Sequence, residues 1–285
     1  MSDLRQGQPF PRPLFALALT LAAAVAIIGV VLAFGSEAPV LAEALAYTLA
    51  FGGVGSLAAR FVPEPADLRL GLTPFSVRAM LPTLLLLPSL LLLSELDNWI
   101  RAALAAAPIE GLGIARAVPA EGALLAVLLL PVLQEFFFRG VLQQGCIARL
   151  GARRGVLFVA LLQGLLTTPT HASDVAGALS ASAQLLALGV LLGFLRIATG
   201  SLLPGIALCI GSAGLTLAAE VFADRVPIAG FNAPGATTPL ALLLPALLSV
   251  ALACRLLVAE LTKQPALPPI PLAAPEDDEE PGPFL

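Results

Sequence analysis

Eight long, mainly apolar stretches follow one another along this chain, with short polar segments between them. A helix that spans a bilayer needs about 20 mainly apolar residues, because every backbone polar group must be bonded within the segment. The stretches lie near residues 14–34, 40–59, 79–98, 122–147, 155–170, 175–198, 201–222 and 239–261. The pattern predicts an all-α fold, a polytopic membrane helical bundle of about eight transmembrane helices.

The composition excludes several other classes of protein. Hydrophobic residues make up 58% of the 285 residues and charged residues 12%, against about 45–50% and about 25% in soluble domains. A soluble protein needs more surface charge, and a disordered chain is less hydrophobic. The net charge of −4 and the lack of a basic cluster exclude nucleic acid as a partner. The lipid bilayer is therefore the main surrounding of this chain.

Two of the apolar stretches are irregular. The third contains Pro82 and Pro88, and the fifth is short for a perpendicular span. Because proline commonly kinks or ends a membrane helix, we expect a break in the third helix. The first stretch is longer than the roughly 7–15 apolar residues of a signal peptide, which favours a retained first helix.

Basic residues are distributed unevenly between the two sides of the predicted bundle. With a cytoplasmic N-terminus, 11 Lys and Arg residues fall on the cytoplasmic side. Only Arg101, Arg116 and Arg225 fall on the other side, and Arg139 falls inside a helix. Cytoplasmic loops are enriched in Lys and Arg, so we expect both termini to be cytoplasmic.

The apolar stretches and the polar ends divide the chain into three parts. Residues 1–13 form a cytoplasmic N-terminus, residues 14–263 the transmembrane bundle, and residues 264–285 a disordered, Pro-rich and acidic cytoplasmic tail. The segments Arg60–Phe75 and Arg101–Glu121 mix prolines, charges and apolar residues, so we expect them to lie along the membrane interface.

Two charged residues fall inside the fourth apolar stretch. Glu135 and Arg139 are four residues apart in QEFFFRG, so they lie on one face of a helix and form an ion pair. Charges inside a membrane are costly and therefore mark candidate functional sites. Spacing alone favours a structural pair that joins two helices.

Three segments of the chain resemble the motifs of the CPBP family of intramembrane proteases, which includes the type II CAAX prenyl endopeptidases. QEFFFRG is similar to the EExxxR motif of that family, and QGLLTTP, from Gln163 to Pro169, resembles its FxxxH segment. ATGSLLPGIALCIGSA resembles the T-G-S-L turn that runs into HxxxN in the family. The resemblance covers a core at about 120–222 and implies a membrane hydrolase, an intramembrane metalloprotease, in a bacterial cell membrane.

Four positions depart from the family pattern. Gln134, Thr167, Cys209 and Ala213 stand where the family has the first Glu, two His and the Asn, and only Glu135, Arg139 and Gly140 are kept. An amide or hydroxyl cannot replace a general base, and both oxyanion donors are replaced. If the family uses a metal, its His ligand is missing here, so we expect no metal or other cofactor. The resemblance therefore indicates a catalytically inactive member, a pseudoenzyme.

Several alternatives stay open. One alternative is an active CAAX prenyl or intramembrane endopeptidase that uses Glu135, His171 or Cys209 in altered roles. Another possibility is a small transporter-like bundle, although we find no inverted repeat. If the protein lacks catalytic activity, we expect it to bind or stabilise a membrane partner: a lipid, a prenylated peptide, or a transmembrane peptide or protein. We expect polar residues to line a cavity between the fourth, fifth and seventh helices: Gln143, Gln144, Gln163, Thr167, Thr168 and Thr170.

Overall fold

The computed structural model describes residues 9–35, 37–104, 120–167 and 175–261. Within these ranges the chain is mainly helical and forms no β-strand, which confirms the predicted all-α class. His171 and the predicted tail, residues 264–285, lie outside the described residues.

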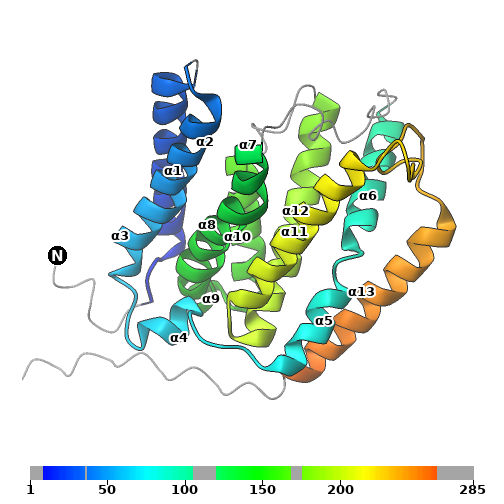
Figure 1. The fold of residues 1–285 in the computed structure, drawn as a ribbon. Coiled ribbons are helices and arrows are strands. Elements are labelled where there is room, and N and C mark those ends of the chain that lie inside the picture. Colours follow the sequence, from blue (N-terminus) through cyan, green and yellow to red (C-terminus); the bar gives the residue numbers. More distant parts are fainter. Residues whose placement is uncertain (1–8, 36, 105–119, 168–174, 262–285) are drawn as a thin grey trace, which may run out of the picture.

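Two spans begin the chain and pack against each other (Figure 1). The first is α1 (Pro13–Phe34), and the second joins α2 (Pro39–Tyr47), the π-helical segment η2 (Thr48–Val54) and α3 (Gly55–Ala59). The residues just before α1 pack against the fourth span, because Gly145 leaves room there for the backbone of Phe10 and Pro11.

The third span is broken, as its prolines predict. After the short helix α4 (Ala66–Leu70), a 3-10 turn η3 (Val77–Ala79) leads into α5 (Met80–Leu85), and α6 (Ser89–Ala103) follows after a turn. Pro88 lies directly before α6 and has no amide proton with which to continue the hydrogen bonds of α5. The span is therefore two helices in sequence.

The fourth span is one long helical rod that contains two π-helical segments. It consists of α7 (Ala120–Leu124), η4 (Leu125–Leu129), α8 (Leu130–Glu135), η5 (Phe136–Leu142) and α9 (Gln143–Leu150). Pro131 cannot donate a hydrogen bond to the preceding turn, and this accounts for the widened turn at η4. Segments of this kind inside helices frequently mark functional sites.

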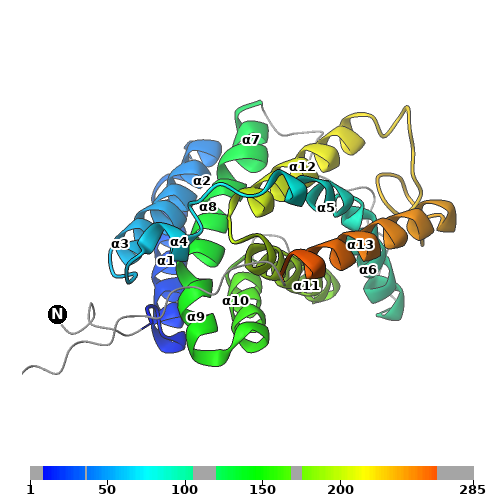
Figure 2. The same ribbon diagram turned by 90° about the horizontal axis from the view of Figure 1, so that it is seen from below.

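Four further helices complete the bundle. They are α10 (Ala152–Thr167), α11 (Val175–Thr199), α12 (Leu203–Val221) and α13 (Leu240–Leu261). α10 lies between α9 and α11, and α13 packs on α5, α6 and α11 (Figure 2).

Seven helical segments of the described residues are long and apolar enough to cross a membrane. The eighth predicted span is α10, which has 16 residues and begins with the exposed Arg153 and Arg154. At 1.5 Å per residue it is about 24 Å long, shorter than a hydrocarbon core of roughly 30 Å. The start of α1 and the end of α13 lie at the same end of the bundle (Figure 1).

Two buried apolar clusters hold the helices together. In the first, Phe51 of the second span stacks on Tyr47 and meets Phe137 and Phe138 of η5 at ring distances of 5.4 and 5.6 Å. The second cluster joins α11, α12 and α13 to the break between α5 and α6; its fully buried members include Leu86, Leu192, Leu208 and Ala253.

The turn between α11 and α12 is tied to the segment after α4. Gly200 has a φ of +69°, and the backbone amide of Leu202 donates to the carbonyl of Gly71. The hydroxyl of Ser201 donates to the carbonyl of Thr73 at 2.6 Å. Part of the segment expected along the interface is therefore packed onto the end of the bundle.

Candidate functional site

Glu135 and Arg139 form an ion pair inside the bundle. Their closest atoms, Oε1 and Nη1, are 3.5 Å apart, and each residue is only 1% exposed. Glu135 ends α8 and Arg139 lies in the π-helical segment η5. Because these side chains are fully buried, the pair needs further polar partners from the surrounding helices.

α11 supplies two of these partners through its backbone. Nη2 of Arg139 donates to the carbonyl of Gly189 at 3.1 Å, and one turn further on Nε2 of Gln143 donates to the carbonyl of Gly193 at 2.9 Å. The sequence predicts Gln143 in a polar cavity with α10 and α12. In the structure its side chain is bonded to α11.

The two glycines let α10 approach α11 closely. A Cβ on Gly189 would lie 2.9 Å from Cβ of Ala160, and a Cβ on Gly193 would lie 2.6 Å from Cγ1 of Val156. Small residues four apart are the usual means by which membrane helices pack backbone to backbone. The spacing G189-V-L-L-G193 is present in the sequence, and it is the signal from which this close packing of α11 could have been predicted.

α12 closes another side of the ion pair. A Cβ on Gly205 would overlap Oε2 of Glu135, so glycine is required for this close approach. Gly205 and Cys209 are four residues apart on α12 and therefore lie on one face of this helix. This face meets the retained charged pair at Gly205.

The remaining positions predicted from the motifs lie in different surroundings. Thr167 is buried at the end of α10, where its hydroxyl donates to the carbonyl of Gln163 at 2.8 Å. Gln134 and Ala213 are half-buried, and within the described ranges no hydrogen bond joins the side chain of Gln134 to Glu135. Gln144, also predicted to line the cavity, donates to the carbonyl of Phe10.

Several buried polar atoms of this cluster have no hydrogen-bond partner among the described residues. They are Oε2 of Glu135, Nε and Nη1 of Arg139, Oε1 of Gln143 and Oε1 of Gln163. Each such atom costs roughly 1–3 kcal/mol when it is left without water or a partner. Unpaired acceptors and donors in one place mark a polar interior that a purely structural apolar core would not contain.

Arg196 adds a second positive charge near Glu135. Its charge and that of Glu135 act on each other, and its Nη2 donates to the carbonyls of Leu68 and Arg69 at 3.3 and 3.1 Å. Gly71 has a φ of +75°, and a Cβ there would overlap the guanidinium of Arg196. From the sequence, Arg196 is expected only as a charge of a cytoplasmic loop. In the structure it is bonded to the backbone of α4.

The cluster does not fit a metal ion. No group of three or more His, Cys, Asp or Glu side chains occurs in the part of the chain that the structure describes. The one carboxylate at the cluster, Glu135, is paired with Arg139 and lies near Arg196, and positive charges beside it disfavour a cation.

The chain as a whole is an integral membrane protein built on a CAAX-protease-like helical core. Residues 117–211 match the family model described as "Type II CAAX prenyl endopeptidase Rce1-like". This match confirms the resemblance of the motifs in this segment to the CPBP/CAAX protease family. No curated protein and no solved structure matches the chain.

Proposed function

We propose that this protein is a catalytically inactive member of the family that binds or stabilises a membrane partner, a prenylated peptide, a transmembrane segment or a lipid. One observation carries the proposal. The retained charged pair, Glu135 and Arg139, is buried and bonded to the backbone of α11, while Gln134, Thr167, Cys209 and Ala213 occupy the other motif positions. The pair stabilises the bundle, and the residues beside it supply neither a general base nor an imidazole.

The rival activity, hydrolysis by altered residues, would need a nucleophile or an activated water at the cluster. Cys209, one turn after Gly205 on α12, is the candidate nucleophile. A thiol reacts as the thiolate, and it is activated by an adjacent base or imidazole. The neighbouring Gln163 and Gln143 provide only amide groups, so the arrangement favours binding over turnover.

We expect no cleavage when the purified full-length protein, in nanodiscs, is incubated with farnesylated CAAX peptides or with transmembrane peptides. Product formation is followed by mass spectrometry, with an active type II CAAX endopeptidase as the positive control. A peptide that binds without being cut should instead be retained with the protein in a pull-down. Cleavage by the wild type that is lost in both Glu135→Ala and Cys209→Ser would overturn the inactive assignment.

We also propose that both termini face the cytoplasm of the cell in which the protein resides. The exposed Arg154, at the start of α10, should then be cytoplasmic, and the exposed Val226, after α12, should lie on the opposite side. In a variant with Cys146, Cys209 and Cys254 replaced by Ala, single cysteines at these two positions report the orientation. We expect a membrane-impermeant maleimide to label Val226→Cys in intact spheroplasts and Arg154→Cys only after lysis. The reverse pattern would contradict the proposed orientation.

A further inference from the structure

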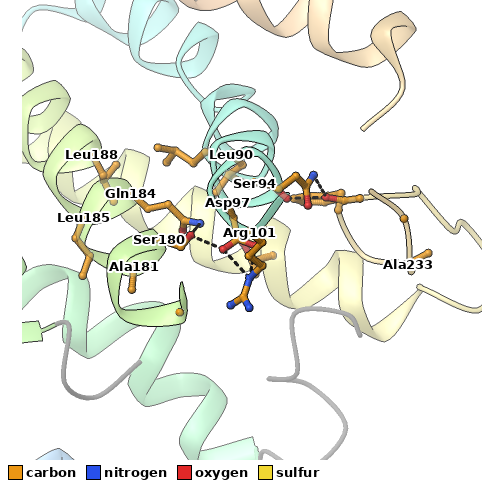
Figure 3. A pocket seen from close by; sticks show the side chains of 17 residues that line it. Leu90, Ser94, Asp97, Arg101, Ser180, Ala181, Gln184, Leu185, Leu188 and Ala233 are labelled. Atoms are coloured by element: carbon orange, nitrogen blue, oxygen red, sulfur yellow. Dashed lines mark hydrogen bonds and ion pairs between the residues drawn. The ribbon is translucent and has the colours of Figure 1, made fainter. Parts of the chain in front are cut away.

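A pocket of about 380 Å³ lies between α6, α11 and the segment that follows α12 (Figure 3), and neither Glu135 nor Arg139 lines it. It combines a polar part with an apolar part. The polar part contains Asp97 and Arg101 of α6 and Ser180 and Gln184 of α11. Clefts of roughly 300–1,000 Å³ with mostly apolar walls and a few convergent polar groups are the usual form of a ligand site.

The rim of the pocket is held by buried polar contacts. Oε2 of Glu95 accepts hydrogen bonds from the amide of Thr238 at 2.7 Å and from Nδ2 of Asn98 at 3.0 Å. The carbonyl of Gly230 accepts from Ser94 at 3.0 Å and from Asn98 at 2.9 Å. These contacts connect α6 to the segment between α12 and α13.

That segment is also fixed from its other side. Oδ1 of Asn232 accepts from the amide of Ile228 at 2.6 Å, and its Nδ2 donates to the carbonyl of Ala219 of α12 at 2.7 Å. Gly230 has a φ of +70°, a backbone conformation that favours glycine. The rim is therefore ordered before any ligand binds, so binding does not have to supply the free energy of ordering it.

Asp97 and Arg101 form an ion pair without net charge, and both side chains keep atoms that can still bind a ligand. Nε of Arg101 lies 3.1 Å from both carboxylate oxygens of Asp97, and the hydroxyl of Ser180 also donates to Oδ1. Nη1 and Nη2 of Arg101 have no partner within the described ranges, and Figure 3 shows them pointing away from Asp97. The pair thus offers donors on the guanidinium and an acceptor at Oδ2 of Asp97.

The apolar part of the pocket continues along the two helices. Leu90 and Leu93 of α6 and Leu185 and Leu188 of α11 line this part. The distance from Leu90 to Arg101 along α6 is about 16 Å at 1.5 Å per residue. This distance spans the whole pocket, and its apolar end beside a polar mouth suits the first part of a single hydrocarbon chain.

We propose that this pocket binds a single-chain amphiphile with a zwitterionic ammonium–phosphate headgroup, of the phosphoethanolamine type. The ammonium would bind Asp97, the phosphate would bind the free side of the Arg101 guanidinium, and the chain would lie along the leucines. A purely anionic headgroup would be repelled by Asp97, and a purely cationic one by Arg101. A headgroup with both charges matches both members of the pair.

This site is separate from the proposed function of the Glu135 cluster. None of the residues that line the pocket belongs to the motif positions of the family core. A failure of one proposal therefore leaves the other standing, because each has its own ligand assay and its own variants.

The test uses full-length, delipidated protein in detergent and native mass spectrometry with 1-oleoyl-lysophosphatidylethanolamine. We expect one bound molecule and binding at least about tenfold tighter than that of 1-oleoyl-lysophosphatidylglycerol, the factor expected for about one charge-assisted hydrogen bond. Free phosphoethanolamine at the same concentration should not compete, because it lacks the chain. Equal binding of the two lysolipids by the wild type, or no binding, would overturn the proposal.

Two variants locate the site. Leu188→Trp fills the apolar part and Arg101→Gln removes the guanidinium; we expect each to weaken lysophosphatidylethanolamine binding about tenfold or more. The matched control is Leu128→Trp, in a separate apolar groove between α2 and the fourth span, which should bind as the wild type does. Unchanged binding by a folded Leu188→Trp variant would show that the lipid does not bind in this pocket. If a variant fails to fold, the comparison of the two lysolipids on the wild type decides alone.

Discussion

Arg139→Ala should cause a large loss of stability, because it leaves two buried groups without their partner. The carboxylate of Glu135 loses its ion pair and the carbonyl of Gly189 loses a hydrogen bond, and both are fully enclosed. Removing one partner of a buried ion pair typically costs about 3–5 kcal/mol. We expect a strongly lowered melting temperature and a lower yield of folded protein in detergent.

The measurement is thermal unfolding of purified protein, followed by fluorescence-detected size-exclusion chromatography after heating. The matched control is Arg154→Ala, which removes an exposed arginine at the start of α10 and should change the melting temperature little. Arg139→Lys keeps the charge but loses the planar guanidinium, so we expect an intermediate value. A melting temperature of Arg139→Ala equal to that of Arg154→Ala would show that the pair contributes nothing to the fold.

Gly189→Ala should destabilise the contact between α10 and α11 in spite of adding a single methyl group. The new Cβ would lie 2.9 Å from Cβ and 3.1 Å from Cα of Ala160, so the two backbones must move apart. Overpacking of this kind usually costs about 1–3 kcal/mol. The shift would also move the carbonyl of Gly189 away from Arg139, which adds to the expected loss.

Two further variants test the reason for this effect. Gly29→Ala in α1 adds the same methyl group where nothing lies within 4 Å, so its melting temperature should not fall. Ala160→Gly combined with Gly189→Ala removes the nearest atom on α10 and should recover part of the loss, as expected for neighbouring sites that are coupled. Equal melting temperatures for Gly189→Ala and Gly29→Ala would argue against close packing of α10 and α11.

Both stability predictions concern the Glu135 cluster. Together they separate a role of this cluster in the fold from a role in binding a peptide. If the ion pair is needed only for the fold, loss of peptide binding in these variants should follow their loss of folded protein. If folded Gly189→Ala protein still binds a prenylated peptide as the wild type does, the close approach of α10 and α11 is not part of the binding surface.

Much of the membrane architecture could be predicted from local sequence. The apolar stretches predicted the spans because lipid forces each backbone polar group to be bonded within its own segment. Pro82 and Pro88 predicted the break between α5 and α6, because proline lacks the amide proton that a continuous helix needs. The spacing of Glu135 and Arg139 predicted their ion pair, because residues four apart share a helix face.

The partners of the polar residues could not be predicted in this way. Gln143 was expected in a cavity, but it bonds to Gly193, 50 residues further along the chain. The polar pocket of α6 was missed altogether, since Asp97 meets Ser180 and Asn98 meets Gly230 only when α6, α11 and the segment after α12 pack together.

The sequence by itself determined the features that lipid imposes locally: helical spans, the break at the prolines, and the charged pair on one helix face. The tertiary structure decided which helix meets which polar group. The reason is that a buried charge or amide is satisfied by whichever backbone comes close enough, and that approach depends on small residues such as Gly189, Gly193 and Gly205 on other helices. Local pattern shows where such groups are buried, and packing decides what they bind.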